Sequence, residues 1–192
     1  MPVAGNRIDP LALLAALPGG RVTAWIGVLL LASVIAYLSV VFADDVDPLA
    51  LGLWSGAFAV VLLAWCGGMA VAMTRDPGDR EILRIWIPLF KAVAIAANVL
   101  IAASVWLFLP VAEPELFALL LVMYVWYIPI QMIAENRATR VSVLATLMVL
   151  GSLVLFVVTH PAPYSTALSV FLLVFTVSVL AMRRVIQRAV WG

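Results

Sequence analysis

Six apolar runs, each about as long as a membrane is thick, constrain this chain more than any other feature of its sequence. They cover residues 22–42, 50–73, 86–109, 115–133, 141–159 and 164–182. A helix needs about 17–25 apolar residues to cross the hydrocarbon core, and it satisfies its backbone hydrogen bonds internally. We therefore expect an all-α integral membrane protein with six transmembrane helices.

Composition supports this fold class and limits what else the chain can contain. Apolar residues make up 66% of the 192 residues and charged residues 11%, against about 45–50% and about 25% in soluble domains. Almost nothing remains for a water-soluble catalytic domain. A net charge of +1 also argues against nucleic acid as a partner.

The connections between the apolar runs are short and rich in proline, glycine and charged residues, as expected where helices end. Consecutive helices should therefore run antiparallel, as three hairpins. We divide the chain into a cytoplasmic tail with a short interfacial helix (1–21), the six-helix transmembrane domain (22–182) and the start of a cytoplasmic helix (183–192).

Charge determines the expected orientation in the membrane. Every arginine falls in the tails or in the second and fourth connections, whereas the other connections carry acidic residues and His160 but no Lys or Arg. The positive-inside rule then places both termini in the cytoplasm. The tryptophans near the ends of the runs are expected at the headgroup level: Trp25, Trp54, Trp86 and Trp106.

Few residues offer catalytic or metal-binding chemistry. Every Asp and Glu lies in a connection or a tail, or, for Glu115, at the first residue of a run, so no paired carboxylates lie deep within a run for proton transfer. Cys66 is the single cysteine, which excludes an intrachain disulfide. We expect no enzyme, no metal site and no cofactor.

Two isolated ionisable residues are possible functional groups. Lys91 is the only lysine and lies inside the third run, where an ionisable group is a functional hypothesis by default; alternatively, its ammonium extends to the cytoplasmic interface. His160 is the only histidine, in an outer connection. It is either a sensor of external pH or simply solvated.

The fourth run contains a polar face. Tyr124, Tyr127 and Gln131 are spaced three and four residues apart, so they share one side of a helix. Tyrosine hydroxyls in hydrocarbon need partners, and Asn98 in the third run is the expected neighbour. These four residues are our candidate ligand-binding site; the alternative is that they serve only to pack the helices together.

Proline and glycine add two further features. Pro88 and Pro129 each remove a helix hydrogen bond near the cytoplasmic side, so we predict that they act as hinges. Gly52 and Gly56 form a GxxxG pattern in the second run, which is typical of helix contacts in membranes.

The order of these features resembles a known family pattern. The third run is rich in small residues and ends in "VWLFLP", an acidic outer turn and an arginine-containing inner turn follow, and the last hairpin ends in "RRVIQR". This layout is similar, from about residue 22 onward, to the six-helix membrane input regions of bacterial sensor histidine kinases and diguanylate cyclases. The similarity lies in hydropathy, turn lengths and helix ends.

The resemblance implies a non-catalytic sensor that relays a membrane or ligand signal through its last helix. It also implies a location in a bacterial inner membrane, a homodimer and a cytoplasmic output domain beyond Gly192. Two other functions fit the residues: an accessory or structural subunit of a membrane complex, and a small carrier for a neutral or apolar solute.

Overall fold

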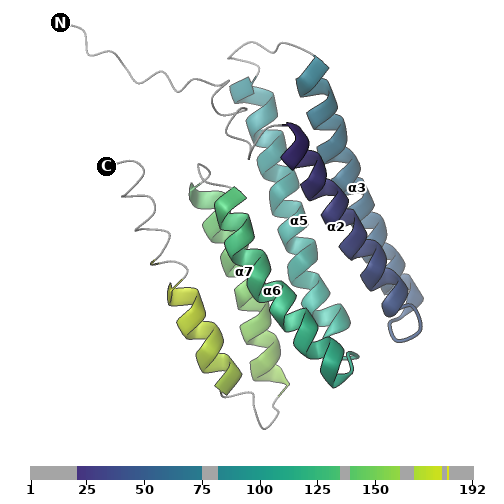
Figure 1. Ribbon diagram of the computed structural model, residues 1–192, viewed down its shortest axis with the longest axis vertical. Coiled ribbons are helices and arrows are strands. Elements are labelled where there is room, and N and C mark those ends of the chain that lie inside the picture. Colours follow the sequence, from purple (N-terminus) through teal and green to yellow (C-terminus); the bar gives the residue numbers. More distant parts are fainter. Residues whose placement is uncertain (1–20, 75–81, 135–138, 161–166, 179–180, 182–192) are drawn as a thin grey trace, which may run out of the picture. The chain divides into compact units, whose positions relative to one another are not determined.

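The computed structural model describes residues 21–74, 82–134, 139–160, 167–178 and 181, and within this part the chain is helical and contains no strand (Figure 1). The elements in chain order are α2 (Arg21–Val41), α3 (Pro48–Thr74), the π-helical turn η1 (Ile82–Trp86), α5 (Ile87–Phe108), α6 (Pro114–Ala134) and α7 (Thr139–Thr159). A further helical segment covers 167–178. Each expected run therefore contains a helix, and the expected all-α class is confirmed.

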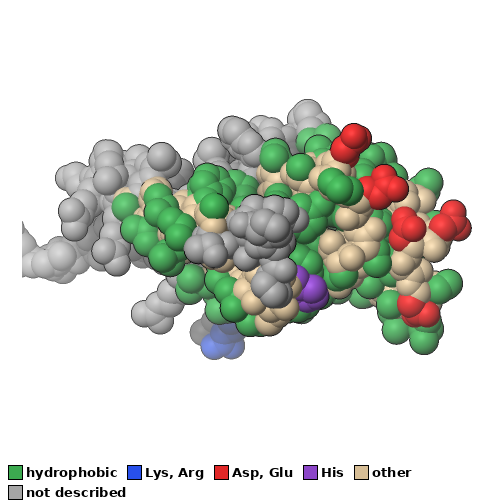
Figure 2. Space-filling view, turned by 90° about the horizontal axis from the view of Figure 1, so that it is seen from below, with side chains coloured by type: hydrophobic (Ala, Val, Ile, Leu, Met, Phe, Trp, Pro, Cys, Tyr) green, Lys and Arg blue, Asp and Glu red, His purple; other side chains and the backbone are tan. Residues whose placement is uncertain are grey.

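Among the described residues, two helices are long and apolar enough to cross a membrane: Pro48–Val71, and Arg84–Phe108 across η1 and α5. Only 11% and 24% of their most apolar stretches are buried, whereas a core helix of a soluble protein is mostly buried. Shorter apolar stretches lie in α2, α6, α7 and 167–178. Figure 2 shows hydrophobic side chains over much of the surface seen from one end.

The chain divides into two compact units, residues 1–97 and 98–192. In the first unit, α2 and α3 pack together as a hairpin. Ile35, Leu38 and Phe42 are buried at spacings of three and four residues, which is the repeat of one helix face. The α3 residues buried at the same spacings are Leu51, Trp54 and Phe58.

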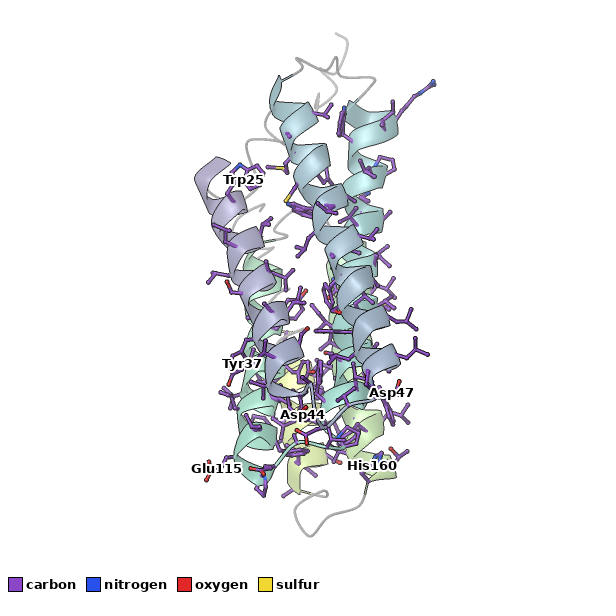
Figure 3. All side chains as sticks on the ribbon, turned by 90° about the vertical axis from the view of Figure 1, so that its right-hand side faces the viewer. Trp25, Tyr37, Asp44, Asp47, Glu115 and His160 are labelled. Carbon is purple, nitrogen blue, oxygen red and sulfur yellow. The ribbon has the colours of Figure 1, made fainter. Side chains whose placement is uncertain are left out.

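The start of α3 has a clear local cause. Asp47 precedes Pro48, and its side-chain Oδ2 accepts a hydrogen bond from the backbone N–H of Ala50 at 2.8 Å. An aspartate at this position satisfies a donor that the helix leaves free, and proline suits the first helical position. Figure 3 shows Asp44 and Asp47 at the end of the α2–α3 hairpin opposite Trp25.

A π-helical turn marks the place where Pro88 interrupts the helix. Pro88 has no N–H to donate to the carbonyl four residues back, at Arg84, so the regular ladder cannot run through this point. The turn Ile82–Trp86 lies where that hydrogen bond is missing. Its i→i+5 bonding is the wider alternative to α-helical bonding, and it ends two residues before Pro88, which itself lies in α5.

In the second unit, the core is formed by side chains from the later part of α5 and from the helices that follow it. The backbone N–H of Phe117 donates to the carbonyl of Glu113 at 2.7 Å, which starts α6 beside Pro114. α6 and α7 pack against each other. The side chains with essentially no exposed surface are Val105, Phe108, Val149, Leu153 and Leu172.

Two of the tryptophans differ from the expectation of headgroup anchoring. Trp54 and Trp86 are each only 7% exposed. Trp54 meets Phe58 edge to face, with ring centroids 5.0 Å apart, and Trp86 lies 6.3 Å from Phe90. Aromatic packing within the protein therefore fixes these two rings.

Candidate functional site

The Tyr124 hydroxyl ties α6 to α5. Its oxygen lies 2.7 Å from the hydroxyl oxygen of Ser104, and both side chains are buried, with 6% and 2% of their surface exposed. The single proton of Ser104 goes to the carbonyl of Ile101 at 2.7 Å, which can only accept. Tyr124 is therefore the donor in the contact with Ser104.

Tyr127 makes the second contact, one turn further along α6. Its hydroxyl donates to Oδ1 of Asn98 at 3.3 Å, and Asn98 is only 1% exposed. The expected pairing of the tyrosine face with Asn98 is confirmed for Tyr127. Because Asn98 is buried, leaving its carboxamide without a hydrogen bond would be costly.

The rest of the predicted face is described only in its backbone. Pro129 and Gln131 lie in α6, which continues without interruption to Ala134, and their side chains lie outside the described residues. The role of Pro129 as a hinge and that of Gln131 as a ligand contact remain predictions. Pro88 is the second residue of α5, and its side chain is exposed.

A second interhelical link, from α5 to α7, was not predicted. The indole Nε1 of Trp106 donates to the hydroxyl of Ser152 at 2.8 Å, and that hydroxyl donates to the backbone carbonyl of Ala102, also at 2.8 Å. Ser152 thus connects α7 to a side chain and to the backbone of α5. Ser104 and Ser152 were missed because a serine in an apolar run also suits simple close packing.

His160 ends α7 in an aromatic cluster. Its ring stacks on Phe156 with centroids 4.3 Å apart, and the Trp106 ring lies 6.0 Å away, inclined by 61°. Its Nδ1 is 3.1 Å from the carbonyl of Phe156, a contact that is a hydrogen bond when Nδ1 carries the proton. His160 is exposed at the end of α7 (Figure 3), and sensing of external pH remains a prediction.

The described side chains between α5 and α6 offer neutral hydrogen-bonding groups and no charged ones. Within the residues that the structure describes, no group of three His, Cys, Asp or Glu side chains could hold a metal ion. The polar groups between α5 and α6 are neutral and hydrogen-bonded to each other. Such groups suit recognition or helix packing.

Comparisons with known protein families, curated proteins and solved structures find no match to this chain.

Proposed function

We propose that this chain is a multi-pass protein of the bacterial inner membrane, with six transmembrane helices and both termini in the cytoplasm. Two helices of sufficient length and apolar character support the proposal. Exposed leucines on α3 also support it, because Leu49, Leu53 and Leu63 are 66–71% exposed and lipid would cover them. The confinement of arginine to the tails and to alternate connections supports the proposed orientation.

Within this topology, the proposed function is a non-catalytic input module that relays a membrane or ligand signal to a cytoplasmic output domain. The observation that carries it is the pair of hydroxyl contacts from α6 to α5: Tyr124 with Ser104, and Tyr127 with Asn98. A ligand that binds these polar groups in only one arrangement of the helices would shift the population toward that arrangement.

The route of the signal follows from chain connectivity. α6 leads through an arginine-containing connection to α7 and then to the last helical segment, 167–178. A change in the packing of α6 would be passed to this C-terminal hairpin. The proposal includes a homodimer and an output domain beyond Gly192, as the resemblance to kinase and cyclase input regions implies.

The test has two steps. The gene is sequenced beyond the codon for Gly192, and the proposal expects a continuing helix followed by a kinase or cyclase domain. The activity of that full-length protein is then compared with the activity of the Tyr124→Phe/Tyr127→Phe variant in membranes. A changed basal or stimulated activity, at unchanged expression and dimerisation, supports the input site; an unchanged activity contradicts it.

The accessory-subunit alternative makes a different prediction. A subunit of a larger complex copurifies in fixed proportion with a defined membrane partner. Quantitative mass spectrometry of the protein purified in mild detergent distinguishes this outcome from a homodimer.

A further inference from the structure

Lys91 lies on an exposed apolar surface near the start of α5. Its side chain is exposed, as are those of Pro88, Leu89 and Ala92. The opposite side of the same helix is buried, because Phe90 packs against Trp65, with ring centroids 5.4 Å apart, and Val93 is only 7% exposed. Lys91 therefore projects from the side of α5 that does not pack against α3.

Arg84 is a second cation on this part of the chain. It lies in η1, seven residues before Lys91, and its side chain is also exposed. Seven helical residues span about 10 Å along the axis. The lysine side chain can shorten this distance by extending toward the level of Arg84, where its ammonium reaches the interface. Between them lie Ile85 and Leu89, both exposed and apolar.

The described carboxylates of this unit are remote from these cations. Asp44, Asp45 and Asp47 all lie at the α2–α3 turn. Gly68 of α3 lies beside Phe90, the residue before Lys91, because a Cβ added at Gly68 would lie 3.4 Å from the Phe90 ring. Gly68 is therefore the residue of α3 that lies level with Lys91. The helical rise from Asp47 to Gly68 is about 30 Å, well beyond the screening length of about 8 Å at physiological salt.

A lysine facing hydrocarbon needs an anionic partner or access to the headgroup layer. An anionic phospholipid of the cytoplasmic leaflet supplies both: its phosphate accepts hydrogen bonds from ammonium and guanidinium groups, and its acyl chains cover exposed apolar side chains such as Leu89. We propose that Arg84 and Lys91 together bind the headgroup phosphate of an anionic phospholipid. This inference rests on the proposed membrane topology, with this end of α5 at the cytoplasmic side.

The test measures lipid preference directly. The full chain is purified in detergent, mixed with equal amounts of phosphatidylglycerol and phosphatidylcholine, and the retained lipids are quantified by native mass spectrometry. We expect a preference for phosphatidylglycerol. A basic residue near an anionic surface contributes about 1 kcal/mol, which corresponds to about a fivefold change in binding. Lys91→Gln and Arg84→Gln should each reduce the preference by about this factor.

The matched control keeps the charge. Lys91→Arg should retain the preference, and Lys91→Gln should elute as the same species with the same helix content, so that a loss of lipid is not a loss of fold. Equal retention of both lipids by the unchanged protein, or an undiminished preference in Lys91→Gln, would overturn the inference.

Failure of the proposed topology has a different signature. A chain that is not embedded in the membrane is released from membranes by alkaline carbonate without detergent. A chain that resists this extraction but shows no lipid preference leaves the topology standing and removes only the Arg84–Lys91 site.

Discussion

The hydrogen bond between Tyr124 and Ser104 leads to an asymmetric stability prediction. Ser104→Ala leaves the Tyr124 hydroxyl buried without its acceptor, because that side chain is only 6% exposed. Leaving a buried polar group unsatisfied costs about 1–3 kcal/mol. Tyr124→Phe removes the donor itself, while Ser104 keeps its own hydrogen bond to the carbonyl of Ile101. The expected cost is then about 0.5–1.5 kcal/mol.

The double variant completes the test. With both hydroxyls absent no unsatisfied group remains, so Ser104→Ala/Tyr124→Phe should be about as stable as Tyr124→Phe alone. The free energy of unfolding is measured by titration with sodium dodecyl sulfate in mixed micelles, followed by circular dichroism. Equal losses in the two single variants that add in the double variant would refute the assigned donor and the buried contact. Tyr127→Phe is a useful comparison, since its bond of 3.3 Å is longer and its loss should cost less.

Three further changes test the packing and the helix ends. Gly68→Ala should be tolerated, because the added Cβ would make an ordinary van der Waals contact, 3.4 Å from the Phe90 ring, and alanine favours the helix over glycine. Gly67→Ala meets nothing within 4 Å and should be neutral or slightly stabilising in the same titration; a clear loss in Gly68→Ala alone would contradict the spacing of α3 and α5 at this point. Asp47→Ala should cost about 1 kcal/mol by removing the cap of α3, whereas Asp47→Asn should retain most of the stability; equal losses would contradict capping. Ser152→Ala should lower the stability less than Ser104→Ala does. The indole of Trp106, which donates to Ser152, is 39% exposed and can find another partner when the serine is removed. An equal or larger loss of stability in thermal unfolding would contradict this.

The positions of the helices were predictable because long apolar runs and charged turns leave few alternatives. The run expected at 115–133, for example, is the helix Pro114–Ala134. The contact between Tyr127 and Asn98 was predictable for a related reason. A short connection makes α5 and α6 antiparallel neighbours, and a buried amide and a tyrosine hydroxyl in an apolar run need partners.

Other features depended on information that hydropathy does not contain. After its first turn, and apart from the face that carries Tyr124, Tyr127 and Gln131, α6 is apolar on every side. That face alone did not show which residue of α5 each tyrosine meets, so the sequence could not assign Ser104 to Tyr124. The π turn before Pro88 was expected only as a bend, because a missing N–H can be accommodated in several ways. The burial of Trp54 likewise depends on a neighbouring aromatic ring one turn away.

The most direct test of the proposed six-helix topology is labelling of single cysteines in intact cells. In a Cys66→Ser background, cysteines replace Glu113 and His160 in the connections proposed to lie outside, and Asp79 and Arg188 in the segments proposed to lie inside. A membrane-impermeant maleimide should label the first two positions in intact cells and the other two only after permeabilisation. Labelling of Asp79→Cys or Arg188→Cys in intact cells, or protection of His160→Cys, would contradict the topology on which the proposed function depends.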